Sequence, residues 1–242
     1  MIIVKLGGSV ITDKDTPETV DEASLTQAAR ALAAVDDDLI VVHGGGSFGH
    51  HFASEYDVSR TQGTEEYEGV VAIHDAMARL NGEVLDALHA EDVPAVPVHP
   101  FSAGFRNTVA DLVFPTGQVR TLLREGFVPV LHGDVVGHEG RGATILSGDE
   151  LVVELAERLD AERVGLCSAV PGVYDENDEV VERIRAFGEV AGALGESEST
   201  DVTGGMAAKV EELLALDVPA TIFDLDGLDA FVREERVGTR IG

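Results

Sequence analysis

Short runs of apolar residues, rich in valine and isoleucine, alternate along this chain with longer segments whose apolar residues recur at helical spacing. The runs span residues 2–6, 39–42, 95–98, 127–131, 163–167 and 220–223. Continuous apolar runs of this length are typical of strands buried on both faces, and strands that alternate with helices form parallel sheets. The pattern predicts an α/β fold, in which an open, mainly parallel sheet is sandwiched between helices.

The intervening segments supply the predicted helices. The segments 22–35 and 70–88 are amphipathic, because their apolar residues recur every three or four positions. Further helices are predicted at 116–124, 150–159, 205–216 and 228–234. Thr116 is the predicted N-cap of the first of these. The glycine-rich stretch 135–144 predicts a hairpin, and the polar run 196–201 predicts a loop.

The chain carries a large negative charge. Its 45 acidic residues and 17 lysines and arginines give a formal net charge of −28, although 44% of the residues are hydrophobic. Because the apolar residues form regular blocks, the acidity belongs to the surface of a folded protein. Such a surface repels nucleic acids and anionic membranes. It is typical of a halophilic protein in a salt-rich cytoplasm, where ions screen the repulsion; the alternative is an ordinary acidic protein.

Three further features limit what kind of protein this is. The 242 residues are enough for one large domain, and no polar linker divides them, so we expect a single domain over 1–242. Cys167 is the only cysteine, which excludes an intramolecular disulfide and a thiolate metal cluster. The N-terminus lacks a basic leader, and no apolar stretch approaches the ~20 residues of a membrane span. We expect a soluble, cytoplasmic protein.

The lysines are few, and each lies close to a glycine-rich segment. Lys5 precedes Gly7-Gly8, Lys14 follows that segment by a few residues, and Lys209 follows Gly204-Gly205. Apart from these three lysines, the 17 lysines and arginines are all arginines. An ammonium group beside exposed backbone N–H groups is suited to binding and neutralising phosphoryl oxygens. We therefore expect the three ammonium groups to converge on one pair of anions. The chemistry that we predict is phosphoryl transfer.

Five glycine-containing loops follow predicted strands or begin predicted helices. They are Gly7-Gly8-Ser9, His43-Gly44-Gly45-Gly46, His132-Gly133-Asp134, Ser147-Gly148-Asp149 and Thr203-Gly204-Gly205. The carboxyl ends of parallel strands meet at one edge of a sheet, where free N–H groups of helix N-termini bind anions. The loops therefore predict an anion-binding site at that edge.

Other motifs fit the sequence less well. Gly44, Gly46 and Gly49 match the dinucleotide-binding fingerprint, with Glu65 or Glu66 at the distance of a ribose ligand. The following residues, 50–65, lack the amphipathic helix that this fingerprint requires, and a nicotinamide enzyme would leave the lysines unexplained. A Walker loop also fails, since Ala208 precedes Lys209 where a glycine is required. No His-x-x-x-His pair with an acidic partner indicates a zinc site.

Taken in order, several motifs resemble a known family over nearly the whole chain. Lys5-Leu6-Gly7-Gly8-Ser9, His43-Gly44-Gly45-Gly46, Ser147-Gly148-Asp149 and Asp201-Val202-Thr203-Gly204-Gly205-Met206-x-x-Lys209 resemble the amino acid kinase superfamily. Gly44-Gly45-Gly46-Ser47-Phe48-Gly49-His50, Thr12-Asp13-Lys14 and His132-Gly133-Asp134 are similar to its isopentenyl phosphate kinases. The resemblance implies a phosphotransferase with a phosphate acceptor, which makes isopentenyl diphosphate from isopentenyl phosphate and ATP in an alternative mevalonate pathway.

The resemblance also implies roles for individual residues. The catalytic set is Lys5, Lys14, His50, Asp149 and Lys209, with Lys14 as the chief transition-state stabiliser. Asp149 would orient the lysines, although a purely structural interpretation makes it a helix N-cap. The ATP set is Lys5, Leu6, Gly7, Gly8, Ser9, Gly46, Gly204, Gly205 and Lys209. Mg²⁺ would arrive with ATP, without protein side-chain ligands.

The acceptor would be bound through a second set of residues. His50 and the N–H groups of Gly45 and Gly148 would bind its phosphate, and Ile73 and Met77 are candidates for an apolar slot. Residues at this spacing are more often core than pocket. The acceptor side would occupy roughly 1–160 and the nucleotide side roughly 161–242, in a homodimer.

One segment departs from the family pattern. Residues 169–174 read Ala-Val-Pro-Gly-Val-Tyr where acidic residues are expected, so the adenosine contacts stay open, with Val170, Tyr174 and Asp175 as candidates. Two alternative functions also stay open. One is a related kinase for another small phosphate, phosphonate or carboxylate, and the other is a non-catalytic nucleotide-sensing protein.

Overall fold

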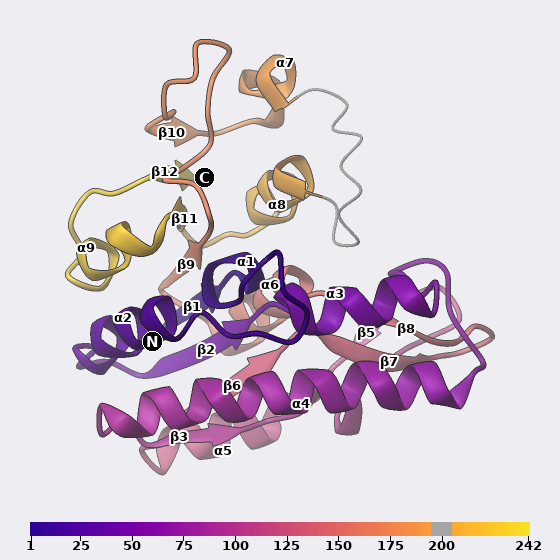
Figure 1. Ribbon diagram of the computed structural model, residues 1–242. Coiled ribbons are helices and arrows are strands. Elements are labelled where there is room, and N and C mark those ends of the chain that lie inside the picture. The colour runs from indigo at the N-terminus through magenta and orange to yellow at the C-terminus, as the bar shows by residue number, and fades with distance from the viewer. Residues whose placement is uncertain (195–204) are drawn as a thin grey trace.

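The computed structural model describes residues 1–194 and 205–242, and its main element is an eight-stranded sheet (Figure 1). Across the sheet the strand order is β10-β12-β11-β9-β1-β2-β6-β3. The strands are β1 (Ile2–Leu6), β2 (Leu39–His43), β3 (Ala95–Pro97), β6 (Val128–His132), β9 (Arg163–Cys167), β10 (Arg183–Ile184), β11 (Ala220–Phe223) and β12 (Thr239–Ile241).

β1 occupies the middle of this sheet. It pairs in parallel with β2 on one side and β9 on the other, so that Lys5 lies opposite Val42 and Leu166. The remaining pairs are parallel as well, except that β12 runs antiparallel to β11. The prediction of an open, mainly parallel sheet is therefore confirmed.

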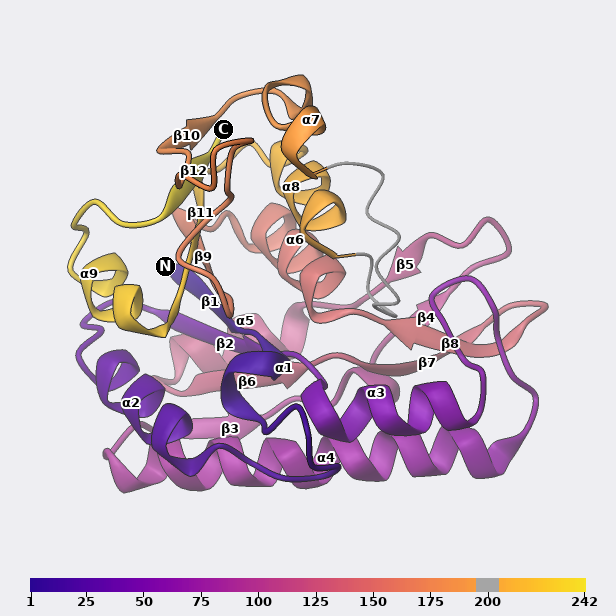
Figure 2. The same cartoon turned by 45° about the horizontal axis from the view of Figure 1, so that its top comes forward.

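Helices cover both faces of the sheet (Figure 2). Helices α1 (Gly8–Ile11), α2 (Glu22–Ala33), α4 (Tyr67–Ala90) and α9 (Leu228–Val232) pack on one face. Helices α5 (Gly117–Arg124), α6 (Gly148–Leu159) and α8 (Gly205–Leu214) pack on the other. Successive strand residues point to opposite faces, so Ile2 and Val4 of β1 meet the first layer and Ile3 the second. The same alternation places Lys5 on the face of α6.

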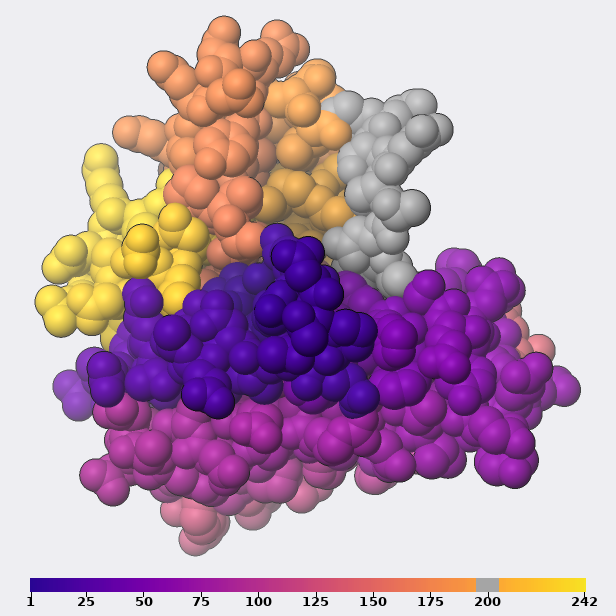
Figure 3. All heavy atoms as spheres, viewed as in Figure 1, coloured from indigo at the N-terminus to yellow at the C-terminus, as the bar shows by residue number. Residues whose placement is uncertain are grey.

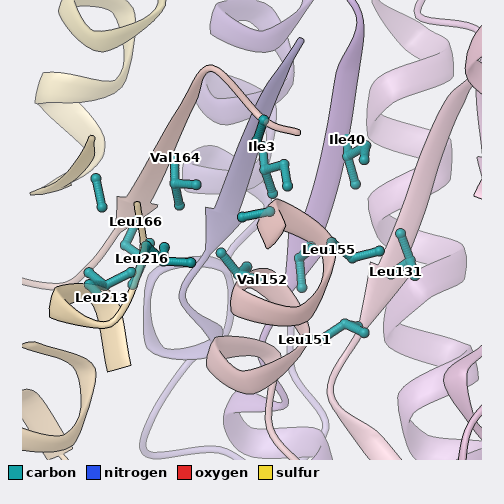
Figure 4. Packing of buried hydrophobic residues seen from close by; sticks show 14 of the residues in the cluster. Ile3, Ile40, Leu131, Leu151, Val152, Leu155, Val164, Leu166, Leu213 and Leu216 are labelled. Carbon is teal, nitrogen blue, oxygen red and sulfur yellow. The ribbon is translucent and has the colours of Figure 1, made fainter. Parts of the chain in front are cut away.

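The core on the α6 face joins strands from distant parts of the chain. Figure 4 shows Ile3, Ile40 and Val164, from three neighbouring strands, around Val152 and Leu155 of α6. Leu213 of α8 belongs to the same cluster. Because these side chains are buried, α6 and α8 are fixed against the sheet on which the functional loops stand.

A second, four-stranded sheet has the order β5-β4-β7-β8. Its strands are β4 (Phe105–Arg106), β5 (Leu112–Val113), β7 (Asp134–His138) and β8 (Gly142–Leu146). β7 and β8 form an antiparallel hairpin, which confirms the prediction at 135–144. The hairpin packs with α3 (Gly46–Glu55) and α4 around a small apolar cluster that includes Ala53, Ile73 and Ile145.

Short elements complete the chain. They are η1 (Pro100–Ser102), η2 (Phe187–Glu189), η3 (Leu225–Gly227) and α7 (Ala191–Leu194). The C-terminal part of the chain, from orange to yellow, forms the upper portion of the molecule in Figure 3, above the N-terminal part. Within the described ranges, no helix is both long and apolar enough to cross a bilayer. The predicted loop 196–201 lies outside the described residues.

Some details of the predictions were wrong. Residues 46–55 form the helix α3, although we found no amphipathic pattern over residues 50–65 and predicted no helix there. Thr116 occupies the N-cap position of α5, as predicted, but its side chain makes no capping hydrogen bond. Helix α6 begins at Gly148, and its N-cap is Ser147 rather than Asp149, because Ser147 and Glu150 form a capping box.

Candidate functional site

A cavity of about 820 Å³ opens at the carboxyl ends of β1, β2 and β6. Its wall is made by the glycine loops that follow these strands, by the start of α6, and by residues of β9 and β11. Lys5, Lys14 and Lys209 all line it, although they come from opposite ends of the sequence. The three ammonium-bearing side chains therefore share one cavity.

Asp149 connects two of these lysines. Its Oδ1 lies 2.6 Å from Lys5 Nζ and its Oδ2 lies 3.6 Å from Lys209 Nζ. The side chains of Lys5 and Asp149 are only 7% and 5% exposed, so the pair is largely withdrawn from water. Burial alone would raise the pKa of Asp149, but the two ammonium groups overcome it and hold that pKa below its usual value. Asp149 is therefore a carboxylate, with both lysines aimed at it.

The N-terminus of α6 fixes Asp149 in this position. Ser147 accepts a hydrogen bond from the N–H of Glu150, and the Glu150 carboxylate accepts one from the N–H of Ser147. This capping box leaves the first-turn residues Gly148 and Asp149 facing the cavity. A residue larger than glycine at 148 would approach the Lys5 side chain to about 3.3 Å. Glycine at position 148 therefore leaves room for the Lys5 side chain.

Lys14 has a different environment. It is exposed, on the segment that connects α1 to α2, where the N–H of Asp13 donates to the carbonyl of Thr19. Within the described part of the chain its ammonium group has no ion-pair partner. Its charge is thus available to an anion that enters the cavity.

Two glycine loops touch each other beneath the cavity. A Cβ on Gly8 would lie 2.1 Å from the backbone nitrogen of Gly46, so only glycine fits there. Gly46 also has a φ of +48°, in the left-handed region. Thr12 fastens the contact, because its hydroxyl donates to Gly8 O (2.8 Å) and accepts from Ser47 N (3.0 Å). The result is a bare backbone surface at the start of α3, open to anions.

Two buried histidines hydrogen-bond to the glycine loops that follow β2 and β6. His43 Nδ1 lies 3.1 Å from Gly44 O, and His132 Nδ1 lies 2.9 Å from Gly133 O. Burial lowers the pKa of His43 to about 4 and lowers the pKa of His132 as well, so both imidazoles are neutral at pH 7. A neutral ring that donates from Nδ1 fixes the orientation of each glycine carbonyl.

Two further hydrogen-bonded pairs involve histidines. His132 Nε2 lies 2.9 Å from His99 Nδ1, and His74 Nδ1 lies 3.0 Å from Asp134 Oδ2. Burial raises the pKa of Asp134, while its hydrogen bond raises the pKa of His74. Asp134 also lines the cavity, so the His74–Asp134 pair lies at the wall of the site.

One end of the cavity is apolar. Ala53, Ile73, Met77 and Ile145 line it, between α3, α4 and β8. Met77 packs against α3, since a Cβ on Gly49 would lie 2.7 Å from its sulfur. His50 stands at this end as well, on the next residue of α3. The cavity therefore combines a cationic part with an apolar part, which suits an amphipathic anion.

Most of the residues singled out from the sequence line this cavity. They are Lys5, Gly7, Gly8, Ser9, Lys14, Gly45, Gly46, His50, Ile73, Met77, Gly148, Asp149 and Lys209. Leu6 does not, because its side chain packs in the core on the other face of the sheet from Lys5. Gly205 begins α8 but is not part of the wall, and Gly204 lies outside the described residues.

The candidates for the adenosine contacts lie elsewhere. Val170, Tyr174 and Asp175 are not part of the cavity wall, and Tyr174 bridges to Val180 in a local turn. Sequence reasoning missed Ser168 and Ile222, which line the cavity at the ends of β9 and β11. Their position after or within strands of the parallel sheet was the signal that could have found them. Sequence reasoning also assigned no role to Thr12 or Asp134, although both belong to motifs that are visible in the sequence.

Known proteins resemble the chain along its whole length. The pattern of the amino acid kinase family matches residues 1–216. The isopentenyl phosphate kinase of Haloferax volcanii is 59% identical over 243 aligned positions, covering 100% of this chain and 98% of that protein. That of Methanothermobacter thermautotrophicus is 41% identical, covering 89% and 86%. A solved structure of an isopentenyl phosphate kinase superposes with a TM-score of 0.86 at 32% identity, covering 100% and 99%.

Proposed function

The chain belongs to the amino acid kinase family, among its isopentenyl phosphate kinases, and we propose that it phosphorylates isopentenyl phosphate with ATP to give isopentenyl diphosphate and ADP. One observation carries this proposal. Asp149 holds the ammonium groups of Lys5 and Lys209 on the wall of a cavity that Lys14 also lines and that is apolar at one end. Such a cavity is complementary to two phosphates and a hydrocarbon tail.

The reaction needs charge neutralisation more than a base. An oxygen of the acceptor phosphate attacks the γ-phosphorus of ATP, the bond from that phosphorus to the β–γ bridging oxygen breaks, and ADP leaves. The acceptor oxygen carries no proton that must be removed, so Asp149 acts by orienting lysines. Two anions must approach, and positioned cations and N–H groups lower the barrier to this.

We assign the cations according to their surroundings. Lys14, which is exposed and has no ion-pair partner among the described residues, stabilises the transferring phosphoryl group. Lys5 of β1 and Lys209 of α8 both pair with Asp149. From these positions they contact the phosphates of ATP. His50 with the N–H groups of Gly45 and Gly148 binds the acceptor phosphate.

ATP is expected to bring Mg²⁺ with it. Within the described residues no three histidine, cysteine or acidic side chains gather as a metal site. Asp149, the acidic residue nearest the lysines, is already engaged by two cations. Mg²⁺ often binds mainly through substrate phosphates and water, and it would supply further neutralisation of the β- and γ-phosphates.

The tail of the acceptor would occupy the apolar end of the cavity. Ile73 and Met77 are 1% and 2% exposed, so they belong to the core as much as to the wall. The first 160 residues or so supply this acceptor side, while Ser168, Lys209 and Ile222 come from the nucleotide side. We propose that the two sides work as one domain.

The wider setting is also part of the proposal. The charge of −28 fits a halophilic, cytoplasmic enzyme of isoprenoid synthesis, and the family resemblance favours a homodimer. Light scattering after size exclusion in molar KCl measures the oligomeric state directly. A mass near that of one 25.5 kDa chain would reject the dimer.

A panel of acceptors tests the function. The purified protein in molar KCl receives Mg-ATP with isopentenyl phosphate, other small phosphates and phosphonates, acetylglutamate and nucleoside monophosphates, and ADP release is measured. We expect the highest kcat/KM with isopentenyl phosphate. A carboxylate or nucleotide that is phosphorylated faster would reject the proposal, as would ATP binding without turnover of any acceptor.

A further inference from the structure

Arg60 bridges two glutamates that are far apart in the sequence. Its Nε lies 3.2 Å from Glu150 Oε2 on α6, and its Nη1 lies 2.8 Å from Glu212 Oε1 on α8. The side chains of Arg60, Glu150 and Glu212 are 29%, 17% and 21% exposed. Because they are partly buried, solvent and salt screen these ion pairs less than pairs on the open surface.

The backbone that carries Arg60 is fixed to the second sheet. Ile145 N donates to Ser59 O at 3.0 Å, and Thr64 and Ala143 exchange two backbone hydrogen bonds of 2.9 Å. Arg141 Nη1 donates to the carbonyl of Thr61 at 2.8 Å. Arg60 therefore extends from a braced segment between α3 and α4, next to the apolar end of the cavity.

Its first partner, Glu150, is equally well fixed. The Glu150 carboxylate caps α6 by accepting from Ser147 N, and it also accepts from Arg106 Nη2 at 2.8 Å. Arg106 is 5% exposed, so this pair is shielded from solvent on the Arg106 side. Glu150 follows Asp149 directly, and the α6 N-terminus is therefore a rigid base for the contact with Arg60.

Its second partner stands on the helix that carries Lys209. Glu212 follows Lys209 by three residues on α8, which places both side chains on one side of that helix. The adjacent side, with Val210 and Leu213, packs into the core. In the described part of the chain, α8 has two ion pairs with the rest of the molecule, Lys209–Asp149 at 3.6 Å and Glu212–Arg60 at 2.8 Å. The second is the shorter.

We propose that Arg60 is a positioning residue for phosphoryl transfer: by joining Glu212 to Glu150, it sets α8 on α6 and holds the Lys209 ammonium beside Asp149, toward the phosphates of ATP. The proposal relies on the proposed function for the role of Lys209 on ATP. Without Arg60, α8 would keep its apolar packing but lose the shorter of its two charged contacts. Lys209 would then point at the phosphates for a smaller fraction of the time.

The test compares the effect of each substitution on ATP binding with its effect on the KM for the acceptor. Arg60→Gln and Glu212→Gln should each raise the Kd of Mg-ATP and lower kcat/KM for ATP by about tenfold, while KM for isopentenyl phosphate stays within about twofold. The double variant should be no worse than either single variant, because both remove the same link. Arg60→Lys, which keeps a charge, should recover part of the loss.

Arg141→Gln is the matched control. It loosens the same segment through Thr61 but touches neither α6 nor α8. Its Kd for Mg-ATP should stay within about twofold of the parent value. If Arg60→Gln does not fold, Glu212→Gln, which is isosteric and leaves the Arg60–Glu150 pair in place, decides the question.

Calorimetric titration with Mg-ATP separates this proposal from the proposed function, since it needs no acceptor. If the parent protein binds ATP but does not phosphorylate isopentenyl phosphate, the acceptor assignment fails while the Kd values still judge Arg60. An unchanged Kd in both Arg60→Gln and Glu212→Gln would overturn the proposal. So would a loss equal to that of Arg141→Gln, a parallel rise in KM for the acceptor, or a parent protein that does not bind ATP.

Discussion

Lys5 Nζ lies 2.6 Å from Asp149 Oδ1, and each side chain is at least nine-tenths buried. Lys5 comes from the central strand and Asp149 from the first turn of α6, 144 residues later. A buried pair of this kind is costly to desolvate and contributes little net stability, yet it becomes strongly unfavourable when one partner is lost. In the proposed function, the pair lies on the cavity wall because Lys5 offers its charge to an incoming phosphate.

Replacing Lys5 should therefore affect folding as well as activity. We expect Lys5→Met to lower the free energy of unfolding by about 2–3 kcal/mol, because Asp149 keeps only the longer contact with Lys209. Urea denaturation in molar KCl measures this. The double variant Lys5→Met/Asp149→Asn should recover much of the stability, since no unpaired charge remains. A single variant as stable as the parent would show that the pair is not buried in solution.

Lys14 should behave in the opposite way. Its side chain is exposed and has no ion-pair partner within the described residues, so Lys14→Met should change the free energy of unfolding by less than about 0.5 kcal/mol. A charge pair at 4 Å is worth about 4 kcal/mol at an effective dielectric of 20, so kcat should fall by about a thousandfold. Lys14→Arg is the control that keeps the charge. Full activity of Lys14→Met would remove Lys14 from the mechanism.

Shortening Met77 should change the selection among acceptors. Met77→Ala enlarges the apolar end of the cavity, so the ratio of kcat/KM for longer alkyl phosphates to that for isopentenyl phosphate should rise. Leu80→Ala is the matched control, because Leu80 is buried on the same helix but does not line the cavity. Both variants should lose about 2–4 kcal/mol of stability. Unchanged selection in a folded Met77→Ala protein would reject this assignment of the tail site.

The buried histidines should make the protein sensitive to acid. Burial lowers the pKa of His43 from 6.5 to about 4, so between these values the unfolded chain binds a proton that the folded chain does not. Stability should therefore fall as the pH falls through this window, by roughly 3 kcal/mol for His43 in full. The raised pKa of His74 acts in the opposite sense, since its contribution is lost as the pH rises.

His43→Gln isolates the effect of His43. Unfolding is followed from pH 7.5 to 4.5 at constant KCl, and the slope in this variant should be smaller than in the parent. His51→Gln, at an exposed position on α3, should keep the parental slope. Equal slopes in all three proteins would mean that His43 is not buried neutral.

The net charge predicts a dependence on salt. With a charge of −28, raising KCl from dilute buffer to 2 M should raise the unfolding midpoint, because the screening length falls to about 3 Å near 1 M. Glu83→Gln/Asp86→Asn, on the exposed side of α4, should reduce this dependence. A midpoint that does not move with salt would indicate an ordinary acidic protein.

The strands were the most predictable part of the fold. β1, β9 and β11 match their predicted limits because they are mainly apolar runs whose residues are almost all buried. α3 was missed because glycines and histidines at its start are poor helix formers, and packing on α4 stabilises it instead. The start of α6 could have been found, since Ser147 and Glu150 have the spacing of a capping box.

The site was predictable as far as it follows from strand ends. Glycine loops after parallel strands come together at one edge, and the lysines beside them follow. The links among side chains could not be predicted. The contact of Arg60 with Glu212 and the hydrogen bond between His132 and His99 depend on how loops and helices pack, which no local pattern in the sequence encodes.

The most direct test of phosphoryl transfer to a phosphate is ³¹P NMR of the purified protein in molar KCl with Mg-ATP and isopentenyl phosphate. We predict that the monophosphate signal is replaced by the two signals of a diphosphate ester, in equal amounts with ADP, and that Lys14→Met slows this conversion by about a thousandfold. Release of ADP with inorganic phosphate, and with the isopentenyl phosphate signal unchanged, would contradict the account.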